Sequence, residues 1–263
     1  MIGFLIKTFN TDLIKNHTKT VILIWILFIL VLPTAIMFMI FLFMGSFTII
    51  DLHLSERSAL LLDAFLSIIF FLQHSILVRK GFKQWLGKFM PDVYHNAFYG
   101  LTSGIALLLV LLFWQKSPTL IARAEGVIFW MLRALFCLCL AGFFWGNKSL
   151  GSFDMLGVKP LMRYISNRPG KPQQIIAKGP YRWARHPLYL FLIVIIWSCP
   201  VVTLDRLLFN IMWTVWIVIA TYLEDRDLHR EFGSQYLEYS SRVPMLIPYK
   251  IPRNTPYDIT NSQ

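Results

Sequence analysis

The chain has 263 residues, of which 56% are hydrophobic and only 15% are charged. This composition excludes an ordinary soluble domain and favours an integral membrane protein. The net charge of +11 does not require a nucleic-acid partner, because membrane proteins collect Lys and Arg in their cytoplasmic loops. The three cysteines lie in apolar runs without metal-ligand spacing, so the sequence predicts neither a disulfide framework nor a metal site.

Six apolar runs follow one another along the chain, each with the length of a membrane-spanning helix, about 17 to 23 residues. They are residues 21–43, 59–78, 97–114, 126–146, 188–204 and 207–223. The first run has no small-residue cleavage site after it, so we expect a retained helix, kinked at Pro33, and not a signal peptide. Only Asp205 and Arg206 separate the last two runs, which predicts a tight helical hairpin. The predicted fold is an all-α, polytopic integral membrane protein with about six transmembrane helices.

Basic residues are divided very unequally between the two sides of this topology. With the N-terminus in the cytoplasm, the cytoplasmic segments contain 20 Lys and Arg and the opposite segments contain 4. Because short loops rich in Lys and Arg stay on the cytoplasmic side, this split predicts that both termini are cytoplasmic.

Polar residues are concentrated in two cytoplasmic segments, residues 147–187 and the C-terminal tail. We therefore divide the chain into a membrane region of four helices, residues 1–146, and a C-terminal region, residues 147–263, that is expected to carry the chemistry. A hairpin brings its two cytoplasmic ends together, so residues 185–187 and 224–225 should be neighbours. We expect a cytoplasmic pocket there, formed by the last hairpin and the tail.

The first of these ends reads KGPYRWARHPLY, residues 178–189. One interpretation is a positive collar with an aromatic belt at the membrane surface. The other is a ligand site, because the Gly179-Pro180 turn leaves backbone N–H groups beside a helix N-terminus, where an anion such as a carboxylate binds. His186 adds a hydrogen-bond donor, and Pro187 suits the first turn of the helix.

The second end begins with Glu224 and Asp225. Two adjacent acids at the C-terminal end of a helix oppose the helix dipole, which indicates a role other than helix stability. The alternative is that the helix continues and that Glu224 pairs with Arg226 or Arg230.

Three more polar residues lie inside the apolar runs, where polar groups are rare and commonly functional. Asp63 and Arg133 lie at similar depths, which predicts a structural ion pair. His74 lies at the cytoplasmic end of its run, as an interfacial histidine or as part of a substrate site.

Taken together, the two ends resemble the paired C-terminal signature of the isoprenylcysteine carboxyl methyltransferase superfamily. The first half is KGPYRWARHPLY, and the second half, beyond the hairpin, is EDRDLHREFGSQYLEYSSRVPMLIP. A weaker similarity over residues 60–91 and 153–157 extends to the branch that contains methanethiol S-methyltransferase and nurim.

This resemblance implies a membrane-embedded methyltransferase that uses S-adenosylmethionine without a Rossmann domain. The positions assigned to the cofactor are Lys178, Gly179, Tyr181, Arg185, His186, Pro187, Tyr189, Glu224, Tyr236, Tyr239, Pro244 and Leu246. The candidate catalytic residues are Glu224, His186, Arg185 and Arg242. The resemblance implies that His186 and nearby amides hold the methionyl carboxylate and that Glu224 faces the amino or sulfonium group. The tyrosines and residues 245–247 are expected to enclose the adenosine.

Two departures from the family pattern bear on the substrate. Asp225 stands where Glu is usual, and Phe191 stands where many members have Gly, which narrows the passage for a bulky lipid. We therefore predict a small thiol, methanethiol converted to dimethyl sulfide, with His74 and Phe191 as candidate substrate residues. Replacing Phe191 by Gly should then widen acceptance of larger thiols.

The reactive form of a thiol is the thiolate, which a basic mouth formed by Arg182, Arg185 and Arg242 would favour. Two alternatives stay open. One is methylation of an isoprenylcysteine carboxylate or a lipid amine, and the other is a non-catalytic, nurim-like membrane protein. The expected partners are the lipid bilayer and a small thiol or lipophilic substrate.

Overall fold

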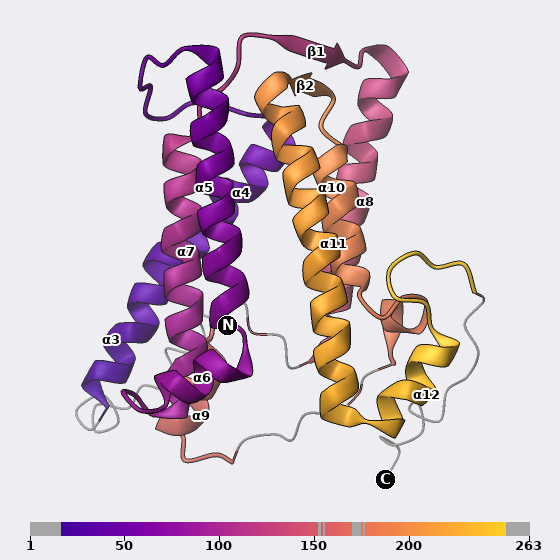
Figure 1. Cartoon of the computed structure of the whole chain (residues 1–263). Coiled ribbons are helices and arrows are strands. Elements are labelled where there is room, and N and C mark those ends of the chain that lie inside the picture. Colours follow the sequence, from indigo (N-terminus) through magenta and orange to yellow (C-terminus); the bar gives the residue numbers. More distant parts are fainter. Residues whose placement is uncertain (1–16, 152–153, 155, 170–174, 176, 251–263) are drawn as a thin grey trace. The chain divides into compact units, whose positions relative to one another are not determined.

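The computed structural model of the chain describes residues 17–151, 154, 156–169, 175 and 177–250, and helices dominate this part (Figure 1). The longer helices are α3 (Thr18–Ile26), α4 (Leu32–Met44), α5 (Glu56–Leu77), α7 (His95–Phe113), α8 (Gly126–Leu150), α10 (Pro187–Trp197) and α11 (Leu204–Phe232). The shorter ones are the π-helical η1 (Leu27–Val31), α6 (Lys80–Leu86), η2 (Asp92–Tyr94), α9 (Val158–Ile165), η3 (Gly179–Arg182) and α12 (Ser234–Arg242). Strand β1 (Leu120–Arg123) pairs antiparallel with β2 (Val201–Thr203). The all-α prediction is confirmed.

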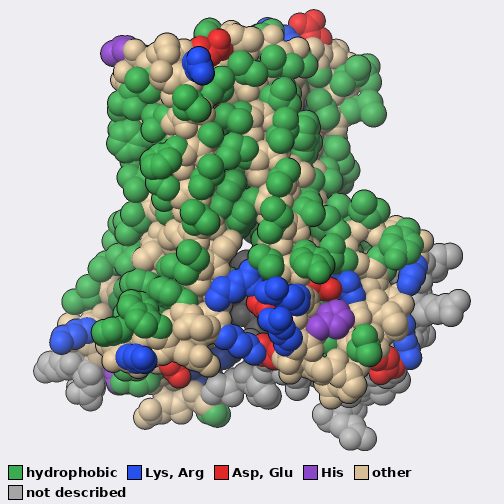
Figure 2. Space-filling view, in the orientation of Figure 1, with side chains coloured by type: hydrophobic (Ala, Val, Ile, Leu, Met, Phe, Trp, Pro, Cys, Tyr) green, Lys and Arg blue, Asp and Glu red, His purple; other side chains and the backbone are tan. Residues whose placement is uncertain are grey.

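Within the part of the chain that the structure describes, five helical segments are long and apolar enough to cross a membrane. They are Thr18–Met44, Glu56–Leu77, Asp92–Phe113, Gly126–Leu150 and Leu204–Phe232. Hydrophobic side chains cover much of their exposed surface, as contact with lipid requires (Figure 2). The first segment changes to π-helical winding directly before Pro33, the residue at which a kink was predicted. The chain is therefore an integral membrane protein.

The fifth predicted span differs from the expectation. Helix α10 has only 11 residues, and the chain then turns into β2. At a rise of 1.5 Å per residue, such a helix is about 17 Å long, shorter than the hydrocarbon core. The predicted set of six is therefore five long helices and one short apolar helix.

The predicted position of the turn between α10 and α11, at Asp205 and Arg206, is also wrong. Asp205 and Arg206 lie in the first turn of α11 and are fully buried. Asp205 accepts hydrogen bonds from Trp114 Nε1 and from the Thr203 hydroxyl, at 2.9 and 2.6 Å. Arg206 donates to the carbonyls of Phe41, Leu42 and Ile196. These charged residues interrupt the apolar pattern because they are satisfied inside the protein, not because the chain turns there.

The predicted ion pair between Asp63 and Arg133 is wrong. Asp63 accepts a hydrogen bond from the backbone N–H of Gln115 at 2.9 Å. Arg133 donates to the carbonyl of Phe43 and lies over the ring of the same residue, 4.0 Å from its centroid. Each group finds a backbone partner nearby, so similar depth in two helices did not imply contact.

The chain divides into two compact units, each assembled from separate stretches. Unit 1 comprises Met1–Phe38, Ile69–Val110 and Asp154–Pro172, and unit 2 comprises Met39–Ile68, Leu111–Phe153 and Gln173–Gln263. In unit 1, buried residues of α3, η1 and α9, such as Ile24, Leu27 and Leu161, form one core.

Aromatic rings fill much of the interior of unit 2. Phe41, Trp114 and Phe209 pack edge to face with one another, with ring centroids 5.2 to 5.7 Å apart. Trp213, one turn further along α11, stacks on Phe209 at 4.6 Å. These contacts fix α11 in unit 2, the unit that contains both halves of the sequence signature.

Candidate functional site

Helix α11 positions the acidic pair. Residues 204–232 contain neither Gly nor Pro, so the helix continues through Glu224 and Asp225 and ends only at Gly233, where φ is +55°. The two acids face different surroundings, since Glu224 is exposed and Asp225 is buried.

The two ends of the hairpin meet, as the sequence predicted. Arg185 forms an ion pair with Asp225, with 3.1 Å between Nη2 and Oδ2. His186 Nε2 lies 3.2 Å from Asp225 Oδ1. Tyr189 donates its hydroxyl hydrogen to Glu224 Oε2 at 2.5 Å. Asp225 therefore joins the start of α10 to α11.

The turn before α10 depends on Gly179 and Pro187. Gly179 begins η3 with φ at +57°, and a Cβ at this position would collide with the side chain of Ser149 on α8. Pro187 occupies the first position of α10, where its missing N–H costs no helical hydrogen bond. This turn places Arg185 and His186 directly before α10.

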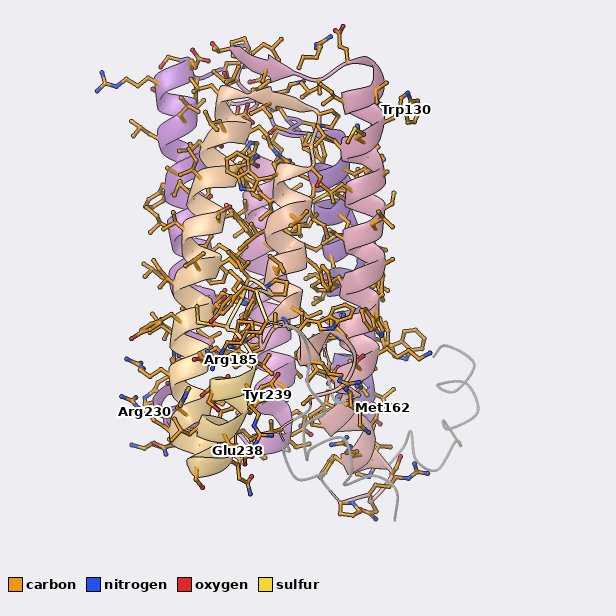
Figure 3. The ribbon with its side chains drawn as sticks, turned by 90° about the vertical axis from the view of Figure 1, so that its right-hand side faces the viewer. Trp130, Met162, Arg185, Arg230, Glu238 and Tyr239 are labelled. Atoms are coloured by element: carbon orange, nitrogen blue, oxygen red, sulfur yellow. The ribbon has the colours of Figure 1, made fainter. Side chains whose placement is uncertain are left out.

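Helix α12 is the third segment that contacts the cluster. Beyond Gly233 the chain reverses, and Tyr236 donates its hydroxyl hydrogen to Asp225 Oδ1 at 2.6 Å. Tyr239 donates to the carbonyl of Tyr181, also at 2.6 Å. Figure 3 shows Arg185 and Tyr239 near each other, whereas Glu238 of α12 is exposed.

The segment after α12, residues 243–247, acts as a strap across the signature. The backbone N–H of Arg185 donates to the carbonyl of Pro244 at 2.9 Å, and that of His186 donates to Met245 at 3.0 Å. These two amides are therefore already satisfied, which argues against the expectation that they hold a carboxylate. A different donor is available, because Arg185 Nε is buried and has no hydrogen-bond partner among the described residues.

Three tyrosines of the cluster are neutral, and two of them, Tyr236 and Tyr239, donate hydrogen bonds. Burial raises the pKa of Tyr181, Tyr236 and Tyr239 above its usual range, and for Tyr236 the hydrogen bond to Asp225 raises it further. The negative charge of the cluster therefore belongs to its carboxylates. Lys and Arg side chains gather around this end of α11 (Figure 2).

Known proteins resemble this chain over most of its length. Methanethiol S-methyltransferase 2 of Bradyrhizobium diazoefficiens is 33% identical over 190 residues, which are 72% of this chain and 73% of the relative. The methanethiol S-methyltransferase of Crocosphaera subtropica is 35% identical, over 73% and 76% of the two chains. That of Mycobacterium tuberculosis is 36% identical, over 69% and 75%.

The chain belongs to the methanethiol S-methyltransferase family. Nurim of Rattus norvegicus is also similar, at 26% identity over 66% of this chain, as expected for the same branch. No protein-family model matches the sequence, and no solved structure does. The protein is accordingly a membrane methyltransferase, and such an enzyme needs a methyl donor.

Of the remaining candidate site residues, some lie beside the cluster and others make their contacts elsewhere. The carbonyl of Lys178 accepts the N–H of Tyr181 at 3.2 Å, and Leu246 is half-buried in the strap. Arg242 points elsewhere, since its guanidinium bonds to Glu238 at 2.6 Å on an exposed face of α12. Phe191 packs against Gly142 of α8, where a Cβ would come within 2.8 Å of its ring.

His74, the other candidate substrate residue, lies in unit 1. Its ring nitrogens contact the hydroxyl of Tyr99, at 2.6 Å from Nε2, and that of Ser103, at 3.2 Å from Nδ1. The ring stacks on Phe70. His74 is therefore more than an isolated interfacial histidine, because it belongs to a polar group between α5 and α7.

Sequence reasoning did not assign a role to Asp225, the residue that contacts most of the cluster. It was noted as the second acid of the pair expected beside residues 185–187 and as a shorter acid than the usual Glu. The signal that pointed to it was the pair of acids directly after the last apolar run, but that pattern does not tell which acid faces inward. Only the rotation of α11 settles this, and the packing of unit 2 fixes that rotation.

Proposed function

We propose that this methyltransferase transfers a methyl group from S-adenosylmethionine to methanethiol, which gives dimethyl sulfide, at the cluster around Asp225. The observation that carries the proposal is the meeting of three separate segments at one end of α11, residues 185–189, 224–225 and 236–245. They belong to the C-terminal region, residues 147–263, in which we place the chemistry. The methanethiol S-methyltransferases to which the chain is similar support the choice of substrate.

The charged groups of the cluster suit the two poles of the cofactor. S-adenosylmethionine supplies a methyl group bound to a positively charged sulfur, next to a carboxylate and an ammonium group. Arg185 offers a buried, unpartnered Nε–H that fits a carboxylate. Glu224 is exposed and, among the described residues, accepts a hydrogen bond from the Tyr189 hydroxyl alone, so its other oxygen fits the ammonium or sulfonium pole.

The strap and the tyrosines offer a surface for the adenosine. Met245 and Leu246 are half-buried, and Ile247 is 67% exposed. Tyr181 and Tyr239 contribute neutral rings, and the Tyr239 hydroxyl donates to the backbone carbonyl of Tyr181. In this arrangement Gly179 and Pro187 set the shape of the turn, and Lys178 and Pro244 hold it through their carbonyls.

The membrane location suits the two substrates. Methyl transfer from a sulfonium requires an in-line nucleophile held near contact distance. A small apolar thiol reaches the site from the bilayer, and a charged cofactor reaches it from water. We place this end of α11 in the cytoplasm, with both chain termini, because Lys and Arg are concentrated there.

The experiment is to express the protein in a host without this activity, supply methanethiol, and measure dimethyl sulfide in the headspace. Binding of S-adenosylmethionine to the purified protein is measured in parallel. We expect both to be positive for the wild type. We expect Glu224→Ala to abolish product formation while the protein still inserts into the membrane.

The two measurements separate the alternatives. Cofactor binding without dimethyl sulfide would exclude methanethiol as the acceptor and leave a lipid or prenylcysteine substrate. Absence of cofactor binding by folded protein would overturn the enzymatic proposal in favour of a nurim-like role.

A further inference from the structure

The hydrogen bonds of Asp225 determine which nitrogen of His186 carries its proton. Arg185 can only donate to the carboxylate, and Tyr236 donates its hydroxyl hydrogen to it. A carboxylate paired with Arg185 is ionised, and an ionised carboxylate only accepts hydrogen bonds. The contact of 3.2 Å between His186 Nε2 and Asp225 Oδ1 therefore requires the hydrogen on Nε2. In the neutral ring, Nδ1 then carries the lone pair, and no described residue makes a hydrogen bond to it.

The ring of His186 is also held in place. His186 is only 5% exposed, and its backbone N–H is bonded to the strap. The ring stacks on Tyr189, with centroids 5.8 Å apart and 23° between the planes. A ring flip would break the contact with Asp225, so Nδ1 keeps one direction.

The other ionisable groups of the cluster do not offer such an acceptor. Tyr236 is a neutral donor, and Arg185 has no lone pair to accept a proton. His229 has both nitrogens in contacts, Nδ1 with the Asp225 carbonyl at 2.9 Å and Nε2 with Ser240 at 3.2 Å. Glu224 is the remaining acid, and its charge is required opposite the cofactor.

We propose that His186 Nδ1 accepts the proton of the thiol and that Asp225 is the positioning residue that holds His186 in this tautomer. The inference rests on the proposed function, and it replaces the expectation that His186 donates to the cofactor carboxylate. A free alkyl thiol is mostly protonated at neutral pH, so a base increases the reactive fraction.

The atoms and electrons of the step balance. The thiol S–H bond breaks and its proton moves to Nδ1, while the electron pair stays on sulfur. This sulfur forms the new bond to the methyl carbon. The old bond from that carbon to the donor sulfur breaks, and its pair stays on the donor sulfur, which loses its positive charge. The imidazolium then releases the proton to water.

The test compares methanethiol with methaneselenol, which has nearly the same shape but is already ionised at neutral pH. The variant is His186→Gln, whose amide N–H can still face Asp225 but which has no basic nitrogen. Loss of a general base should lower methanethiol turnover about a hundredfold or more. Methaneselenol turnover should fall less than about tenfold. The ratio of the two losses does not depend on how much of the variant folds.

A second variant tests the positioning role. In Asp225→Asn the new amide can donate to Nε2, which moves the ring proton to Nδ1 and removes the acceptor, as happens in triads with the same substitution. We expect the same selective loss with methanethiol. His229→Gln, the other histidine beside Asp225, is the matched control and should change both rates by the same factor.

Three results would overturn the inference. They are an equal loss on both acceptors in His186→Gln, a loss of S-adenosylmethionine binding in that variant, and failure of the wild type to methylate the selenol while it methylates the thiol. Failure of the wild type on both acceptors would instead reject the proposed function.

Discussion

Glu224 and Asp225 are adjacent in the sequence, but the structure gives them different partners. Asp225 is 9% exposed and contacts Arg185, His186 and Tyr236, whereas Glu224 is exposed and contacts Tyr189. Successive residues of an α-helix point about 100° apart, so one acid faces inward and the other does not. We therefore expect separate roles for the two acids, with Asp225 holding protein contacts and Glu224 available to a ligand.

Glu224→Gln should remove the charge and keep the hydrogen bond with Tyr189. We expect dimethyl sulfide formation to fall about a hundredfold or more, because an amide does not stabilise a cationic cofactor as a carboxylate does. Headspace analysis measures the rate, and equilibrium binding measures the cofactor affinity. Glu238→Gln, an exposed acid on α12, is the control and should stay within about twofold. A Glu224→Gln rate equal to that of the wild type would remove Glu224 from the site.

Arg242 matches the family motif, but its side chain pairs with Glu238 on the exposed face of α12. An exposed ion pair of this kind contributes at most about 1 kcal/mol. We therefore expect Arg242→Gln to lower dimethyl sulfide formation less than about fivefold. A hundredfold loss with unchanged thermal stability would show that Arg242 turns toward the substrate and would restore the basic mouth proposed from the sequence.

At the scale of elements, the turn into α10 has the tightest backbone constraint of the site. Gly179 combines a left-handed φ of +57° with a position against Ser149 and Trp145 of α8. Gly151 has a similar φ of +59°, but a Cβ there would meet nothing within 4 Å. The two glycines share the backbone conformation and differ in the space around them.

Gly179→Ala should therefore destabilise the protein more than Gly151→Ala. We expect a difference of about 1 to 3 kcal/mol in the free energy of unfolding, because both variants are strained but only one forces a collision. Thermal unfolding in detergent with each variant measures it. Adding Ser149→Gly to Gly179→Ala should recover part of the loss, and equal melting temperatures for the two alanine variants would contradict the packing of η3 on α8.

For the hairpin, the sequence predicted the contact between its two ends correctly but placed its turn at the wrong residues. The sequence predicted that residues 185–187 and 224–225 meet, and they do. It placed the turn at Asp205 and Arg206 because charges interrupted two apolar runs. Each of these charges instead finds several partners within unit 2, which no local pattern reveals. The actual connection includes β2, which is too short to be recognised without its partner β1.

At the scale of the whole molecule, the order of elements in unit 2 determines which parts share a membrane side. Helix α10 runs away from the cluster to β2, and α11 returns to it (Figure 1). The β1–β2 pair therefore lies at the end of unit 2 opposite to the cluster. Since Lys and Arg are concentrated at the cluster end, we expect this end in the cytoplasm.

Reporter fusions test this orientation. A fluorescent protein fused after the C-terminus should fold, because it stays in the cytoplasm, and alkaline phosphatase inserted after Arg123 should be active, because it is exported. Exchanging the two reporters is the control and should abolish both signals. Active phosphatase at the C-terminus would reverse the orientation and would deny the cluster direct access to a cytoplasmic cofactor.

The sequence by itself determined the membrane class, four of the six spans nearly to their ends, and the two segments that form the cluster. It could do so because hydrophobic length, Lys and Arg asymmetry and a paired motif are local or additive properties. The tertiary structure alone decided that Asp225 is the central acid, that Arg242 pairs with Glu238 and Phe191 packs on α8, and that the strap occupies the amides of Arg185 and His186. These features depend on helix rotation and on contacts between distant segments, and packing sets both.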